Sequence, residues 1–165
     1  AFADVMEGKH ESAIEPYRQM SSMDPGNPMA RLFYIWALVL NRSIADAREV
    51  FEAFPLEVRD TIPAQIAGFL VRAGGRKSEP AAAPPDIVLR DTAGDVFPRM
   101  LAQAYALAAM PDDALACLKV AVDRGFINYP FLANHDPFFE RIRTLPAFQE
   151  LLAIVRDRWQ AFEPI

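Results

Sequence analysis

Few side chains in this sequence have the type and spacing that catalysis or metal binding requires. The two histidines, His10 and His135, lie far apart in the chain, and neither has a second ligand at helical spacing. His135 lies close in sequence to Asp136 and Glu140, an arrangement that could be interpreted as a general base accompanied by carboxylates. An aspartate directly before a proline is more typical of a helix start, so we interpret Asp136 as a solvent-exposed cap. We predict no catalytic residue, no metal site and no bound cofactor.

The other reactive groups also have a structural interpretation. Gly74 and Gly75 precede Arg76 and Lys77, but the rest of a phosphate-binding loop is missing. Cys117 is the single cysteine, so the chain cannot form an internal disulfide. Because apolar residues surround it at helical spacing, we predict a buried and inert thiol. The sequence therefore predicts a protein that is not an enzyme.

Composition narrows the classes of partner. The chain has 165 residues, of which 52% are hydrophobic and 24% charged, so it can bury a core. Its formal net charge of −5 gives no overall attraction to phosphate backbones, and we expect no nucleic-acid partner. No apolar run approaches the roughly 20 residues of a membrane-spanning helix, and no signal peptide is visible. We expect no membrane partner and a cytoplasmic location.

The helices that must position these side chains recur along the chain at a regular spacing. Ala47 lies 34 residues after Ala13, and Ala114 lies 67 residues after Ala47, one short of twice 34. Each alanine is followed by a bulky or apolar residue four and seven positions later: Tyr17 and Met20, Phe51 and Phe54, Leu118 and Ala121. A period near 34 is typical of stacked helical hairpins of the tetratricopeptide class.

The period divides the chain into four hairpin units and a closing segment within a single domain, residues 1–165. The predicted units are about 1–26, 27–59, 60–94 and 95–126, followed by a capping segment, 127–165. Three prolines, Pro80, Pro84 and Pro85, predict that the third unit is degenerate, with a proline-rich loop over 76–94. Half of the first hairpin is missing and the chain lacks a starting methionine, so we expect a fragment of a longer protein.

Local signals predict the helix boundaries. Residues 10–23 form a helix with Ala13, Ile14, Tyr17 and Met20 on one face. The apolar run 32–40 forms a helix that is either enclosed by neighbours or offers one face to a partner. Gly125 ends the fourth unit as a glycine after the last turn. Thr144 caps a final helix with an apolar stripe that closes the end of the array: Phe148, Leu152, Val155, Trp159 and Phe162.

Two segments resemble known repeat proteins. Gly8 to Tyr17, ending in Met23-Asp24-Pro25, resembles the second half of a tetratricopeptide repeat. Residues 113–126 are similar to the last repeat of bacterial tetratricopeptide proteins, and their continuation to Trp159 resembles the terminal segment found there. The chain departs from the family pattern at three positions: Arg31 replaces the usual first-helix aromatic, and Arg42 and Ala109 replace the usual turn glycines. The resemblance implies an all-α, tetratricopeptide-like right-handed superhelix of antiparallel helical hairpins with C-terminal capping helices.

The resemblance also implies a function. Such arrays often follow a serine/threonine kinase, an adenylate cyclase or a winged-helix domain, so we expect a docking or regulatory scaffold for a protein or peptide in bacterial signalling. The expected groove is lined by first helices: Leu32, Trp36, Val39, Ile66, Leu70, Arg99 and Gln103. The lysines and asparagines that bind acidic C-termini are missing there, which favours an amphipathic segment. Two alternatives stay open: that Trp36 and Leu70 are simply core, and that the chain is a small-molecule sensor. Self-association is also left open.

Overall fold

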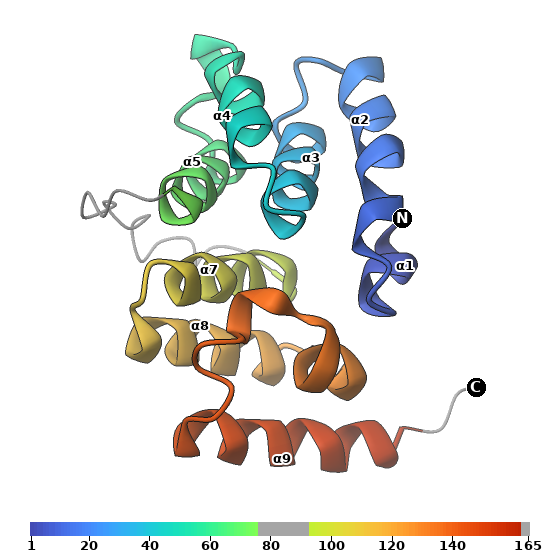
Figure 1. The fold of residues 1–165 in the computed structure, drawn as a ribbon, viewed down its shortest axis with the longest axis vertical. Coiled ribbons are helices and arrows are strands. Elements are labelled where there is room, and N and C mark those ends of the chain that lie inside the picture. The colour runs from blue at the N-terminus through green and yellow to red at the C-terminus, as the bar shows by residue number, and fades with distance from the viewer. Residues whose placement is uncertain (76–92, 163–165) are drawn as a thin grey trace.

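The computed structural model describes residues 1–75 and 93–162, and in these ranges the chain is helical without strands (Figure 1). The elements in chain order are α1 (Phe2–Met6), η1 (His10–Ala13), α2 (Ile14–Met23), α3 (Pro28–Leu40), α4 (Ile44–Glu52), η2 (Leu56–Val58), α5 (Ile62–Gly74), α7 (Val96–Leu107), α8 (Pro111–Asp123), η3 (Phe131–His135), η4 (Pro137–Phe139) and α9 (Pro146–Gln160). The predicted all-α, tetratricopeptide-like repeat fold is confirmed. Residues 76–92 of the predicted proline-rich loop lie outside the described ranges.

The helix α3 is the apolar helix that the run 32–40 predicts. Asn27 begins it, since its side-chain oxygen accepts hydrogen bonds from the backbone N–H groups of Met29 at 3.0 Å and Ala30 at 3.3 Å. Pro28 stands in the first turn, where its missing N–H costs nothing. The helix packs against α2, α4 and α5, which explains its burial on nearly every side.

Small residues let neighbouring helices approach closely. A Cβ atom added to Gly68 of α5 would lie 2.7 Å from the Cζ atom of Phe51 on α4, so a larger residue there would force the Phe51 ring to shift. Arg31, at the position of the usual aromatic, lies with its guanidinium carbon 5.4 Å from the centroid of the Phe54 ring. Its Nε donates a hydrogen bond to the Pro25 carbonyl at 2.7 Å, so an arginine ties the first unit to the second.

The two turns that lack their usual glycine adopt the backbone of a glycine turn. Arg42 has a φ angle of 62° and Ala109 a φ angle of 58°, both in the left-handed region. Gly125, with a φ angle of 104°, confirms the predicted glycine after α8. The family pattern therefore located the turns at Arg42 and Ala109, although neither carries the glycine that suits this backbone, and the local glycine signal located the turn at Gly125.

The C-terminal segment begins with η3 and η4, which pass beside α7, and ends in α9 at the outer end of the array (Figure 1). Asp136 precedes η4 as predicted, but it is fully buried, so the expected solvent-exposed cap is wrong. The residue before α9 is Leu145 and not the predicted Thr144, because Pro146 already takes the first helical turn. Of the predicted stripe on this end, Trp159 and Phe162 are 41% and 60% exposed.

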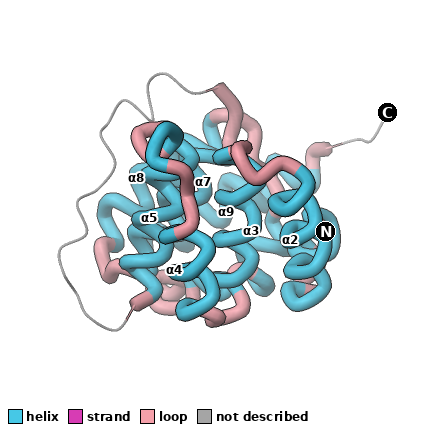
Figure 2. The backbone as a smooth tube through the Cα atoms, turned by 90° about the horizontal axis from the view of Figure 1, so that it is seen from above, coloured by secondary structure: helices cyan, strands magenta, loops and turns pink. Residues whose placement is uncertain are grey.

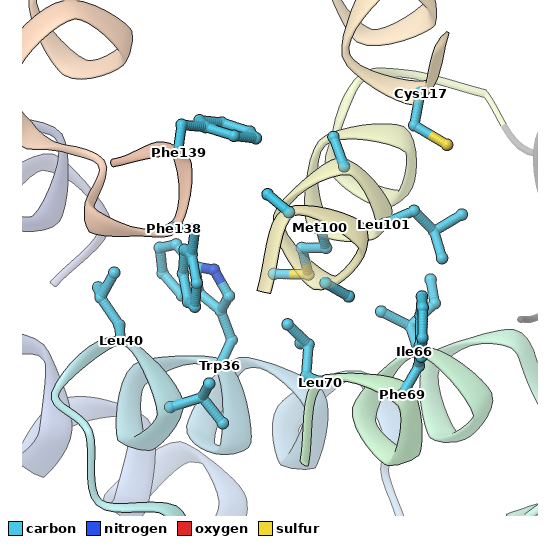
Figure 3. Close-up of a cluster of buried hydrophobic side chains, with 14 of the residues drawn as sticks. Trp36, Leu40, Ile66, Phe69, Leu70, Met100, Leu101, Cys117, Phe138 and Phe139 are labelled. Atoms are coloured by element: carbon cyan, nitrogen blue, oxygen red, sulfur yellow. The ribbon is translucent and has the colours of Figure 1, made fainter. Parts of the chain in front are cut away.

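The core joins the repeat units to the C-terminal segment. In the close-up, Phe138 and Phe139 of η4 point toward the side chains that α3, α5 and α7 contribute (Figure 3). Seen from above, helices make up most of the described chain, with loops and turns between them (Figure 2). Ala13 and Tyr17 of the first unit are buried, whereas Met20 is 37% exposed, so the predicted inward face of that helix is one turn too long. Among the described residues, no helix has the length and apolar character needed to cross a bilayer.

Candidate functional site

The seven residues expected to line an open groove are all buried. They come from three first helices, α3, α5 and α7: Leu32, Trp36, Val39, Ile66, Leu70, Arg99 and Gln103. The expectation of an exposed groove is therefore wrong for this conformation, because the chain's own segments cover these side chains. Asp136 of the C-terminal segment is hydrogen-bonded to Gln103, and the ring of Phe2 on α1 lies over Arg99. Binding of a partner at these positions stays a prediction.

A chain of hydrogen bonds crosses this buried face from α3 to the C-terminal segment. The indole Nε1 of Trp36 donates to Gln103 Oε1 at 2.8 Å, and Gln103 Nε2 donates to Asp136 Oδ2 at 2.7 Å. The other carboxylate oxygen of Asp136 accepts from the Phe138 backbone N–H at 3.0 Å. An ionised carboxylate can only accept hydrogen bonds. Asp136 therefore fixes which group donates and which accepts in this series of bonds, from Trp36 through Gln103 to the carboxylate.

Trp36 and Gln103 occupy equivalent positions in the second and fourth units. They are 67 residues apart, the same offset that relates Ala47 to Ala114. The bond therefore links two first helices, α3 and α7, directly. Two of the residues expected to line the groove are thus bonded to each other in the interior.

Burial governs the ionisation of Asp136. It raises the pKa of the carboxyl to about 6, against the opposing effect of the hydrogen bonds from Gln103 and Phe138 and of the nearby cations Arg99 and Arg143. Arg143 also donates through Nη2 to the Asp136 carbonyl at 2.6 Å. Asp136 is thus a buried acid that can change protonation near neutral pH.

Arg99 of α7 is fully buried, and its three side-chain nitrogens lack hydrogen-bond partners. The nearest carboxylate oxygen, Oδ2 of Asp95, lies 3.8 Å from Nε, too far for a hydrogen bond. Three aromatic rings surround the guanidinium carbon, with centroids at 5.4 Å for Phe2, 5.6 Å for Trp36 and 5.2 Å for Phe126. Burial lowers the pKa of Arg99, while Asp136, Asp95 and Tyr17 oppose that effect.

Sequence reasoning selected Arg99 and Gln103 but missed the residues that enclose them. Asp136 had the signal of a helix cap, and that signal is the same for a buried and an exposed cap. The apolar character of Phe2 and Phe126 did not predict their contacts with Arg99, because these contacts join segments that are distant in sequence. A fully buried arginine also cannot be distinguished by pattern from one on the wall of a groove.

The two histidines lie together, although the sequence separates them. An added Cβ atom on Gly8 would be 2.7 Å from His135 Nδ1, so the turn after α1 rests on η3. Burial lowers the pKa of His10, and contact with the backbone of His135 opposes that effect. Within the described ranges, no three histidine, cysteine, aspartate or glutamate side chains are grouped to hold a metal ion. Cys117 is buried, as predicted.

Comparison with known proteins gives one match. A family model described as the tetratricopeptide repeat matches residues 5–68, which run from α1 into α5. Nothing among the curated proteins or the solved structures matches the chain. The matched residues include the helical pairs α2–α3 and α4–α5, and α3 and α5 are two of the three first helices that line the buried face. Together with the all-helical fold, the match supports a tetratricopeptide-type repeat protein.

Proposed function

We propose that this chain is a non-catalytic scaffold for protein–protein interaction, the docking or regulatory C-terminal region of a bacterial signalling protein in the cytoplasm. The observation that carries the proposal is the tetratricopeptide match over residues 5–68, because such repeats generally mediate binding between proteins. The partner is a protein or peptide with an apolar face, since five of the seven first-helix positions are apolar.

A partner that uses the first-helix positions must displace the segments that cover them. Asp136 of the C-terminal segment accepts a hydrogen bond from Gln103, and Phe138 of the same segment is buried, so we expect this segment to hold the position that the partner would take. A substitution that loosens the C-terminal segment should strengthen partner binding, whereas removal of the Trp36 indole should weaken it. The two substitutions should therefore change the affinity for the partner in opposite directions.

The experiment starts by co-purifying proteins with the tagged chain from its native lysate and expressing each captured protein in pure form. Titration calorimetry then measures binding of each pure protein to wild type, Phe138→Ala and Trp36→Ala. We expect saturable binding that Phe138→Ala tightens and Trp36→Ala weakens, with Trp159→Ala at the far end of the array as the unchanged control. If no purified candidate binds saturably to wild type or Phe138→Ala, the scaffold proposal is wrong.

A second function, a small-molecule sensor that controls an attached domain, is favoured by one observation. Arg99 is enclosed and offers hydrogen-bond donors that nothing in the described chain accepts. A ligand that binds only the folded chain would raise its melting temperature. A thermal-shift screen with metabolites tests this function, and the absence of any stabilising compound would overturn it.

A further inference from the structure

We propose that Arg99 is the anchor of a binding site for a small apolar monocarboxylate, and that the Phe2 side chain is the displaceable cover of this site. The inference rests on the sensor function and is independent of the scaffold function. Its geometry consists of a buried guanidinium without acceptors, a cage of aromatic rings, and a cover on the shortest α-helix of the described chain.

The missing acceptors define the chemical class of the ligand. A guanidinium offers five N–H donors in a planar fork, and a carboxylate accepts two of them in parallel. Leaving such donors unpaired in the interior costs several times the net value of a normal hydrogen bond. The rings of Phe2, Trp36 and Phe126 near Arg99 suit an apolar body attached to the carboxylate.

Access requires only a local movement. Phe2 is 43% exposed and its ring lies over the Arg99 guanidinium, so displacing this side chain would uncover one side of Arg99. The helix α1 has five residues and no side-chain cap, and Gly8 follows it with a φ angle of 83°. Helices of this length are marginal unless packing holds them. The volume for the ligand is the volume that the Phe2 ring now fills.

Charge balance determines how the carboxylate binds. The charged or titratable groups that act on Arg99 are Asp95 from the start of α7, Tyr17 from α2 and Asp136 from the C-terminal segment, and Arg143 acts on Asp136. Two aspartates already balance the guanidinium, so an added anion would be repelled if both stayed ionised. Asp136, whose pKa is about 6, can take up one proton and become neutral. The ligand carboxylate then replaces Asp136 as the counterion of Arg99.

The test uses benzoate as the probe and benzamide, its neutral counterpart, as the control ligand. Titration calorimetry measures both at pH 6 and pH 8 on the full chain. We expect saturable benzoate binding at pH 6 that weakens about tenfold for each pH unit above the pKa of Asp136, because one proton is taken up with each ligand. Benzamide should bind at least tenfold more weakly than benzoate.

Variants separate the site from the rest of the molecule. Phe2→Ala removes the cover and should bind benzoate more tightly than wild type. Arg99→Met keeps the length of the side chain without its charge and should lose benzoate binding, while Arg48→Met on the exposed side of α4 should keep it. Circular dichroism verifies that each variant is folded.

Three results would overturn the proposal: no saturable benzoate binding to wild type or Phe2→Ala, equal binding of benzoate and benzamide, or affinity that does not change between pH 6 and pH 8. If Arg99→Met does not fold, the comparison of benzoate with benzamide binding to Phe2→Ala still tests whether the site recognises a carboxylate. Failure of these tests leaves the scaffold function intact, since that function depends on a protein partner. Failure of partner binding would equally leave the carboxylate site intact.

Discussion

Gln103 is the central residue of the buried hydrogen-bond chain, because its amide both accepts from Trp36 and donates to Asp136. In Gln103→Leu both bonds are lost, and the indole N–H and one carboxylate oxygen stay buried without partners. Each such group costs about 1–3 kcal/mol, so we expect the free energy of unfolding to fall by about 2–6 kcal/mol. Urea denaturation at pH 7 measures the change.

The matched control is Gln65→Leu. The Gln65 amide donates to the Asp60 carbonyl at 3.0 Å near the surface, where water can replace the bond. We expect a change of no more than about 0.5 kcal/mol in the free energy of unfolding. Equal losses in the two variants would show that the buried chain of bonds has no special role.

The ionisation of Asp136 makes stability depend on pH in an unusual direction. Its pKa of about 6 in the folded chain lies above the ordinary 3.8, so the folded state holds the proton more tightly than the unfolded state does. The free energy of unfolding should therefore fall as pH rises from the ordinary pKa through 6. Between pH 5 and pH 7 the expected loss is about 1 kcal/mol, and urea denaturation at both values measures it.

His10 changes the free energy of unfolding with pH in the opposite direction, so it has to be replaced before the contribution of Asp136 can be measured. The lowered pKa of His10 favours its neutral form in the folded chain, so its contribution grows as pH rises through 6.5. The measurement therefore uses a His10→Gln background, in which Asp136→Asn should abolish the remaining slope. A carboxyl carbon titration by NMR gives an independent answer, and a midpoint near 4 for Asp136 would contradict the prediction.

At the scale of elements, the turn after α7 contains removable strain. Ala109 is exposed and has a φ angle of 58°, a conformation that costs a residue with a Cβ atom about 1–2 kcal/mol. Ala109→Gly relieves that cost but gives the unfolded chain more freedom, so we expect a net gain of about 1 kcal/mol. Thermal denaturation should show a higher melting temperature.

The same substitution in an ordinary helix end should have the opposite effect. Ala53 follows α4, is exposed, and has a φ angle of −78° that any residue adopts. Ala53→Gly should lower the free energy of unfolding by about 0.5–1 kcal/mol. If glycine destabilised the chain equally at positions 53 and 109, the left-handed backbone at Ala109 would not be a source of strain.

The elements that were predicted correctly are those whose signals are local. The apolar run 32–40 and Asn27-Pro28 determine α3 from neighbouring residues alone, and the family pattern located the turns at Arg42 and Ala109. The placement of η4 against α7 was not predictable, since it depends on contacts between residues distant in sequence, such as Gln103 and Asp136, which are 33 positions apart. For the same reason the groove was predicted as open: a first-helix side chain has the same sequence spacing whether or not a later segment covers it.

At the scale of the whole molecule, the C-terminal segment and the repeat units share one core. Phe139 of η4 is fully buried, and η4 packs against α7 of the fourth unit. Phe139→Ala should lower the free energy of unfolding by about 3–5 kcal/mol, since it leaves a cavity in this shared core. In contrast, Trp159→Ala removes a side chain that is 41% exposed and should cost much less.

The two tryptophans report on the two parts separately, which tests the single-domain prediction. With Trp159→Phe, the fluorescence of Trp36 follows the repeat units alone, and circular dichroism follows all helices. We expect the two transitions to coincide, and Phe139→Ala to shift them together. If Phe139→Ala moved only the dichroism transition, the C-terminal segment would unfold independently of the repeats.

The bond between Trp36 and Gln103 also bears on how this chain can evolve. An array held only by contacts between adjacent repeats can gain or lose a repeat by gene duplication or deletion at little cost. Here a donor in the second unit requires an acceptor in the fourth, so identical copies of one repeat could not form the bond. A hairpin inserted between them would pull the pair apart. A gain or loss of a repeat between the two units would therefore cost this bond, whereas substitutions within the existing units need not.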